Sequence, residues 1–135
     1  MILQTVGFFH SAHFLSNYLG KCKNIHGHTY AYFISILLTN VKLKNGMLFD
    51  FSTINKTFDH KLLCNENDKS IFNEHEVLYM KGNPTAENIA LYIAKMIKSE
   101  VPNCSVIVRL WEDISNLINI QKLKNAEGEY IEVRE

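Results

Sequence analysis

Strand-like and helical patterns occupy separate blocks of this sequence, and their order constrains the fold more than any other feature. Residues 2–14 and 28–39 are rich in β-branched and aromatic side chains, which is typical of two paired strands joined by a loop. Two helical patterns follow, and residues 104–111 and 117–123 form two more strand-like runs. Helices that are segregated from antiparallel strands pack on one face of the sheet, so the order predicts an α+β domain.

Both helical patterns carry a start signal and an apolar face. Ser52 can cap the first helix. Its apolar residues recur every four positions, at Ile54, Phe58 and Leu62. For the second helix, Asn83 can act as the cap and Pro84 suits the first turn. Its apolar face consists of Ala86, Ile89, Ala90, Ile93, Ala94 and Ile97.

Length and composition restrict the class of protein. The 135 residues are enough for one domain over residues 1–135, and the chain contains no linker-like segment. Fourteen basic and fourteen acidic residues cancel, so no overall field steers the chain toward nucleic acid or an anionic membrane. The longest mostly apolar stretch, residues 31–38, is far shorter than the roughly 18 to 20 residues that span a bilayer. We therefore expect no nucleic-acid or membrane partner.

The cysteines and the sheet edges suggest the cellular compartment and the oligomeric state of the protein. An odd number of cysteines without regular spacing argues against a disulfide framework and favours a reducing, cytoplasmic compartment. The cysteines are Cys22, Cys64 and Cys104. A small sheet with two open edges often covers them by joining copies around a symmetry axis, so we expect a homo-oligomer.

Three histidines have the spacing of a metal site. His26 and His28 are separated by Gly27, so on a strand they point to the same face. His13 lies near the end of the preceding strand, and an antiparallel return brings it beside that pair. Three neutral imidazoles leave one position open on tetrahedral zinc, as in catalytic sites. The alternative is that these are ordinary strand histidines with satisfied ring nitrogens. His10 falls on the other strand face and is left out.

Cys22 lies four residues before His26, in the loop expected over the metal. Lys21 and Lys23 flank it, and nearby positive charge favours the thiolate, which makes Cys22 a candidate base or nucleophile. Two alternatives stay open. Cys22 can be a fourth zinc ligand, which closes the site into a structural one, or an inert small residue.

Two further acidic positions stand out. Asp59 and His60 are adjacent at the expected end of the first helix, where a carboxylate can orient a histidine or raise its basicity. The alternative is a solvated helix end. Glu112 follows Trp111 at the end of a strand, where its carboxylate can accept two parallel hydrogen bonds from an amino-pyrimidine edge, or be an ordinary turn residue.

Taken together, these residues and their order resemble the 6-pyruvoyl-tetrahydropterin synthase and 6-carboxytetrahydropterin synthase family. The Cys-x-x-x-His-Gly-His piece with an upstream histidine is the most specific part, and the matching pieces run through nearly the whole chain. These pieces are Phe9-His10-Ser11-Ala12-His13, Cys22-Lys23-Asn24-Ile25-His26-Gly27-His28-Thr29-Tyr30, Gly46-Met47-Leu48-Phe49-Asp50-Phe51, Phe58-Asp59-His60-Lys61, Asn83-Pro84-Thr85-Ala86-Glu87-Asn88 and Trp111-Glu112.

The resemblance implies a tunnelling fold, in which a four-stranded antiparallel sheet carries two helices on one face and forms trimeric barrels that stack as hexamers. It implies 7,8-dihydroneopterin triphosphate as the substrate and Zn²⁺ as the cofactor. By the family's pattern the residues then take these roles: His13, His26 and His28 hold the zinc, Cys22 is the catalytic base, Asp59 and His60 relay protons, Glu112 anchors the pterin, and Thr85 lies near it.

There are three functional hypotheses, two from the resemblance and a third in which Cys22 closes the zinc site. The first is a 6-carboxytetrahydropterin synthase of the queuosine pathway, which releases acetaldehyde and triphosphate. The second is a 6-pyruvoyl-tetrahydropterin synthase acting on the same substrate. The third is a non-catalytic zinc-binding assembly module.

One departure from the family is Cys64, where the pattern more often has asparagine and where a second thiol near the site can bind metal or oxidise. The charged tail 125–135 carries no motif.

Overall fold

The computed structural model describes residues 1–16, 20, 23–68, 76–113 and 120–135. Its strands are β1 (Ile2–His13), β2 (His26–Leu37), β3 (Lys61–Asn65), β4 (Val77–Met80), β5 (Ser105–Trp111) and β6 (Ile131–Arg134). Its α-helices are α1 (Ser52–Phe58), α2 (Ala86–Glu100) and α3 (Ile120–Lys124), and Glu66–Asp68 forms a short 3₁₀ helix. The α+β class is therefore confirmed, although the number of elements exceeds the expectation.

The six strands form one mixed sheet in the order β4-β3-β1-β2-β5-β6. The pairs β1/β2, β2/β5 and β5/β6 are antiparallel, whereas β3 lies parallel to both β1 and β4. The expectation of a four-stranded, purely antiparallel sheet is thus wrong. Strands β3 and β4 contain only five and four residues, which is too short for a two-residue hydrophobic period to be recognised.

Helix α1 ends at Phe58, earlier than the spacing of apolar residues suggested. Asp59 is already extended, and His60 takes a left-handed backbone conformation with φ of +58°. A non-glycine residue with positive φ cannot continue a right-handed helix. Leu62, expected on the helix, therefore belongs to β3, and the turn at His60 directs the chain beside β1.

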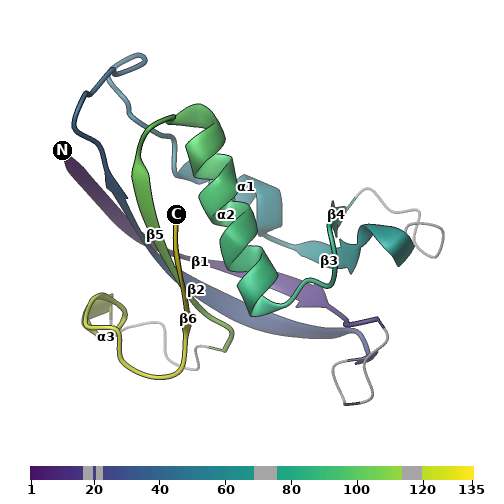
Figure 1. The fold of residues 1–135 in the computed structure, drawn as a ribbon. Helices are drawn as coiled ribbons and strands as arrows, with labels where there is room; N and C mark the ends of the chain where they lie inside the picture. The colour runs from purple at the N-terminus through teal and green to yellow at the C-terminus, as the bar shows by residue number, and fades with distance from the viewer. Residues whose placement is uncertain (17–19, 21–22, 69–75, 114–119) are drawn as a thin grey trace.

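Helices α1 and α2 pack on the same face of the sheet, as expected. Figure 1 shows α2 lying across the central strands, with α1 behind it. The apolar face of α2 meets buried residues of β2 and β5, including Ile34 and Val108, while Phe58 of α1 stacks on Phe9 of β1 at 5.0 Å between ring centroids. No helix within the described residues is long and apolar enough to cross a membrane.

The opposite face of the sheet carries the short helix α3. Its Leu123 packs with Ala31 and Phe33 of β2 and Trp111 of β5 in a second, smaller cluster. The strand expected at 117–123 is wrong for residues 120–123, which are helical, and residues 117–119 lie outside the described part of the chain. Alternating apolar residues in a segment this short are compatible with either conformation.

Helix α2 begins two residues later than the sequence suggested. The cap is Thr85, whose side-chain oxygen accepts a hydrogen bond from the backbone N–H of Asn88 at 3.2 Å. Asn83, the expected cap, instead accepts hydrogen bonds from the backbone N–H and the hydroxyl of Ser16, at 3.1 and 2.9 Å. Asn83 thus ties the end of the β1 segment to the start of α2.

The charged tail is structural in part. Residues 131–134 form β6, the edge strand beside β5. Glu132 accepts a hydrogen bond from Arg109 Nε at 2.7 Å and another from Arg134 at 2.9 Å, and these guanidinium groups hold the pKa of the Glu132 carboxyl below its usual range. The tail therefore supplies one edge strand of the sheet.

Gly7 leaves room for the Tyr32 ring between β1 and β2. It lies opposite Tyr32, and a Cβ on residue 7 would collide with the Tyr32 ring. Because Tyr32 is buried and its hydroxyl donates to Asn55 at 2.8 Å, the ring cannot move away freely. We expect Gly7→Ala to lower the free energy of unfolding by about 2 kcal/mol, measured by urea denaturation.

Gly27→Ala is the matched control for this substitution. Gly27 also lies in a strand, but a Cβ on this residue would find the Ser11 carbonyl oxygen as its nearest neighbour, at an ordinary 3.8 Å. Equal destabilisation by both substitutions would contradict the steric explanation.

Candidate metal centre

Three imidazoles converge where β1 ends and β2 begins. His13 lies directly opposite His26 in the antiparallel register, and His28 follows two residues along β2 on the same face. Nε2 of His13 lies 3.0 Å from Nε2 of His26 and 3.0 Å from Nε2 of His28. The structure therefore brings the three sequence-predicted histidines together, as a group that could hold a metal ion.

Each imidazole uses its other ring nitrogen, Nδ1, to donate a hydrogen bond to an oxygen acceptor. The acceptors are the Pro84 carbonyl for His13 at 2.6 Å, the Asn24 carbonyl for His26 at 2.7 Å, and the Asp113 carboxylate for His28 at 2.7 Å. An N–H on Nδ1 leaves a lone pair on Nε2 of the neutral ring. Outer hydrogen bonds of this kind fix the tautomer and orientation of metal-binding histidines.

The separation of the Nε2 atoms fits a zinc ion. Zinc–nitrogen bonds of tetrahedral sites imply about 3.3 Å between neighbouring ligand nitrogens, close to the 3.0 Å observed. Three Nε2 atoms at this distance can share one metal ion. The donor set, three imidazoles with oriented Nε2 atoms, therefore fits Zn²⁺.

Burial lowers the basicity of the central ligand. His13 is only 1% exposed, and the loss of hydration lowers its pKa to about 4, against the opposing effect of the Pro84 carbonyl. The neighbouring His28 and His26 also disfavour its charged form. His13 is thus neutral at physiological pH, which is the form that binds a metal ion.

This pKa makes the stability of the metal-free protein depend on pH. The unfolded chain protonates this imidazole near pH 6.5, whereas the folded protein does so only near pH 4. Because the unfolded state binds more protons between these values, the free energy of unfolding should fall by about 3 kcal/mol as pH drops through this window. Urea unfolding of the chelator-treated protein at several pH values measures the effect.

The His13→Gln variant isolates this contribution from that of other acids. The difference in unfolding free energy between wild type and the variant should shrink as pH falls from 6.5 to 4. A difference that stays constant across this range would contradict the assignment to His13.

Glu112 approaches the same group of nitrogens. Its Oε1 lies 3.3 Å from Nε2 of His13 and 3.3 Å from Nε2 of His28. The side chain leaves the end of β5, where buried Trp111 pairs with Ala31 of β2. The sequence suggested contact with a heterocycle, whereas the geometry places this carboxylate against the histidines.

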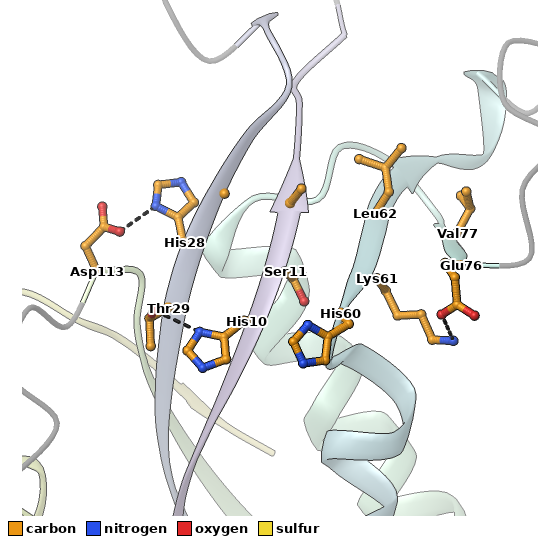
Figure 2. Close-up of a pocket in the computed structure, with 12 residues that line it drawn as sticks. His10, Ser11, His28, Thr29, His60, Lys61, Leu62, Glu76, Val77 and Asp113 are labelled. Carbon is orange, nitrogen blue, oxygen red and sulfur yellow. Dashed lines mark hydrogen bonds and ion pairs between the residues drawn. The ribbon is translucent and has the colours of Figure 1, made fainter.

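A cavity of 780 Å³ extends from His28 to His60 across the ends of the strands. Figure 2 shows His10 and His60 on one side of it and the His28–Asp113 pair on another. Asp59 and His60 do meet, since Asp59 Oδ2 lies 3.5 Å from His60 Nε2, and Asp59 Oδ1 also accepts from the backbone N–H of His10 at 2.9 Å. The His60 side chain is 78% exposed and open to solvent.

A second cavity of 390 Å³ adjoins the histidine group at His13. His13, Thr85, Glu112, Glu129 and Tyr130 are among the residues that line it. Thr85 and Glu112, which the sequence pattern associated with a heterocycle, therefore share one cavity next to the candidate metal centre. The backbone of Thr85 is held there by its role as the α2 cap.

The cysteines differ in what the structure describes. Cys22 and its neighbour Lys21 lie outside the described residues. Cys64 is fully buried in β3, and burial raises the pKa of its thiol, which keeps it protonated and unreactive. It does not belong to the group of possible metal ligands. The suggestion that Cys64 binds the metal therefore finds no support in its position.

Three groups that orient the ligands were not predicted from the sequence. They are the Asp113 carboxylate, the Pro84 carbonyl, and the Tyr30 hydroxyl, which lies 3.2 Å from His13 Nδ1. Asp113 carried a signal, because it is an acidic residue directly after Glu112. The Pro84 carbonyl carried none, since it lies 71 residues from His13 in the chain.

The known proteins to which this chain is similar are tetrahydropterin synthases. A family model described as 6-pyruvoyl tetrahydropterin synthase matches residues 3–122. The 6-carboxy-5,6,7,8-tetrahydropterin synthase of Rickettsia bellii is 34% identical over 74% of this chain and 94% of its own length. That of Rickettsia typhi is 30% identical over 93% of this chain and 94% of its own length.

Solved structures share the fold. The 6-pyruvoyl tetrahydropterin synthase of Plasmodium falciparum aligns with a TM-score of 0.65 at 14% identity, covering 100% of this chain and 97% of its own. That of Caenorhabditis elegans aligns with a TM-score of 0.55 at 27% identity, covering 86% and 91%. Both carry the same architecture.

Proposed function

The chain belongs to the 6-pyruvoyl tetrahydropterin synthase family, and from this premise we propose that it is a zinc-dependent lyase acting on 7,8-dihydroneopterin triphosphate. The products are 6-carboxy-5,6,7,8-tetrahydropterin, acetaldehyde and triphosphate, with one water consumed, in queuosine biosynthesis. The observation that carries the proposal is the convergence of the Nε2 atoms of His13, His26 and His28, two of which line cavities.

The metal centre supplies the electrophile. His13, His26 and His28 would hold Zn²⁺, which when bound acts as a Lewis acid toward the side-chain hydroxyls of the pterin and acidifies the adjacent C–H bonds. The protein's contribution is orientation, because each imidazole is held by a hydrogen bond at Nδ1. Rigid ligands keep the geometry of the site fixed when the substrate enters.

Two groups move protons in this proposal. The Cys22 thiolate removes a proton from the substrate side chain on one face, and Lys21 and Lys23 favour its ionised form. His60 delivers or accepts a proton on the other face from the 780 Å³ cavity. Asp59, 3.5 Å from His60 Nε2, orients the ring. Because the two groups lie on opposite faces of the substrate, one can remove a proton while the other delivers one.

The pterin ring belongs in the 390 Å³ cavity. There the Glu112 carboxylate accepts two parallel hydrogen bonds from the amino-pyrimidine edge, and Thr85 lies close to the ring. Proximity of this cavity to His13 allows the substituent on the ring to reach the metal centre.

A 6-pyruvoyl-tetrahydropterin synthase is the alternative product assignment. It needs the same substrate and site, but the side chain keeps all three carbons and no water is consumed. The names of the relatives from Rickettsia favour the carboxy product, whereas the description of the family model names the pyruvoyl product. We therefore place the carboxy synthase first.

We further propose one domain over residues 1–135, a cytoplasmic location and a homo-oligomeric assembly, as a trimer or hexamer. Exposed apolar side chains at Ile2, Ile25 and Leu37, and the open edges at β4 and β6, support self-association. Sedimentation velocity of the zinc-loaded protein tests the assembly.

Product analysis tests the reaction. Zinc-loaded protein is incubated with 7,8-dihydroneopterin triphosphate, and pterins are identified by mass spectrometry while acetaldehyde is assayed enzymatically. We expect one carboxypterin and one acetaldehyde for each substrate consumed. A pterin that retains three side-chain carbons, without acetaldehyde, would establish the alternative, and unchanged substrate would refute both.

A further inference from the structure

Glu112 stands in a position that its proposed contact with the pterin does not explain. Its Oε1 lies at 3.3 Å from Nε2 of both His13 and His28. The backbone there is fixed, because Trp111 ends the β2/β5 pairing and its indole N–H donates to the Glu127 carbonyl at 2.8 Å. The strand register therefore fixes the point from which the Glu112 side chain extends.

The other ring nitrogen of each histidine is already engaged. The three Nδ1 atoms contact the Pro84 carbonyl, the Asn24 carbonyl and the Asp113 carboxylate, which leaves Nε2 of each ring directed at the centre of the group. Glu112 Oε1 joins two of these Nε2 atoms at 3.3 Å. Ring nitrogens and a carboxylate oxygen at 3.0 to 3.3 Å from one another are spaced as the ligands of one metal ion.

The same distances match a four-ligand site. Ligand atoms at the corners of a tetrahedral zinc site are about 3.3 Å apart, and a carboxylate oxygen is an ordinary zinc ligand. The three nitrogens with the Glu112 oxygen supply the usual number of ligands. A catalytic site with three histidines needs a fourth ligand that can leave, which is commonly water.

We propose that Glu112 is the fourth metal ligand of the substrate-free protein and that the substrate displaces it. This inference rests on the proposed function. One carboxylate oxygen cannot bind the metal and the pterin edge together, so the two roles alternate. When the carboxylate leaves, three neutral ligands remain and the charge of the site rises by one unit. The centre therefore becomes more strongly electrophilic only when substrate is present.

Metal affinity and anion access test the resting state. Zinc affinity is measured by competition with a chromophoric chelator, and access to the metal by titrating Co²⁺-loaded protein with thiocyanate and recording its visible spectrum. For Glu112→Gln and Glu112→Ala we expect zinc affinity to fall about 10- to 100-fold and thiocyanate to bind at least about 10-fold more tightly than in the wild type. An amide or methyl group provides no anionic ligand.

Glu129→Gln is the matched control. Glu129 lines the same cavity but is exposed, so its substitution removes the same charge from the cavity without removing a ligand. It should leave both affinities at the wild-type values. Circular dichroism of the metal-free variants confirms that each is folded before titration.

Neopterin, which carries a hydroxylated side chain, tests the displacement. Added to Co²⁺-loaded wild type, neopterin should change the visible spectrum of the metal. It should also compete with thiocyanate, because both occupy the ligand position that Glu112 leaves. Wild-type affinities for zinc and thiocyanate in both Glu112 variants would overturn the inference and leave the proposed function intact. Failure of the wild type to bind zinc would overturn both.

Discussion

Replacement of His26 by alanine is expected to lower zinc affinity by at least about a thousandfold, since even an outer partner of a metal ligand is worth about 10- to 100-fold. His26 supplies one of the three converging Nε2 atoms and lies only 3.0 Å from that of His13. Its ring is half-buried rather than part of the core, so the fold should persist. Turnover should disappear with the metal. Elemental analysis after gel filtration measures the zinc content, and product assays measure the turnover.

His10→Ala provides the control for this substitution. His10 lies on β1 three residues before His13, but its Nδ1 contacts the Thr29 hydroxyl at 3.0 Å and its ring faces the larger cavity. It does not belong to the histidine group. Zinc content should therefore equal that of the wild type. Equal loss of zinc in the His10 and His26 variants would contradict the assignment of the ligands.

Replacement of Cys22 by alanine is expected to reduce kcat about 10²- to 10⁴-fold while zinc content and thermal stability stay unchanged. The reason is that the proposed thiolate takes a proton from the substrate and is not a metal ligand. Steady-state kinetics with elemental analysis measure both quantities. If Cys22 instead closes a structural site, the same substitution should remove zinc and stability, which would favour a non-catalytic zinc-binding module.

Cys64→Ala is the matched control for the thiol. Cys64 is fully buried in β3, and burial raises the pKa of its thiol. Its loss should leave kcat within about twofold of the wild type while costing about 1 kcal/mol of stability through lost packing. A large fall in kcat in this variant, with normal zinc content, would assign the base to the wrong cysteine.

The metal centre was predictable from sequence because it depends on short-range geometry. His26 and His28 share a strand face by the two-residue period, and an antiparallel return sets His13 opposite His26. The apolar face of α2 was equally clear, since its five buried residues follow the helical period. These features need only local pattern and one pairing.

Other features depend on contacts that local pattern does not encode. Histidine adopts positive φ more often than most residues but still uncommonly, which is too weak a signal to reveal the end of α1 and the start of β3. The parallel pairing of β3 with β1 joins segments about fifty residues apart. The approach of Glu112 to His13 depends on the β2/β5 register, which sequence alone does not specify.

Anomalous scattering at the zinc absorption edge tests the central claim most directly. Crystals of the protein grown with zinc and without substrate should show one peak about 2.0 to 2.1 Å from Nε2 of His13, His26 and His28. Glu112 Oε1 should lie at a similar distance from the same peak. Imidazoles that point apart, or a peak bound elsewhere while these nitrogens hold no metal, would contradict the account.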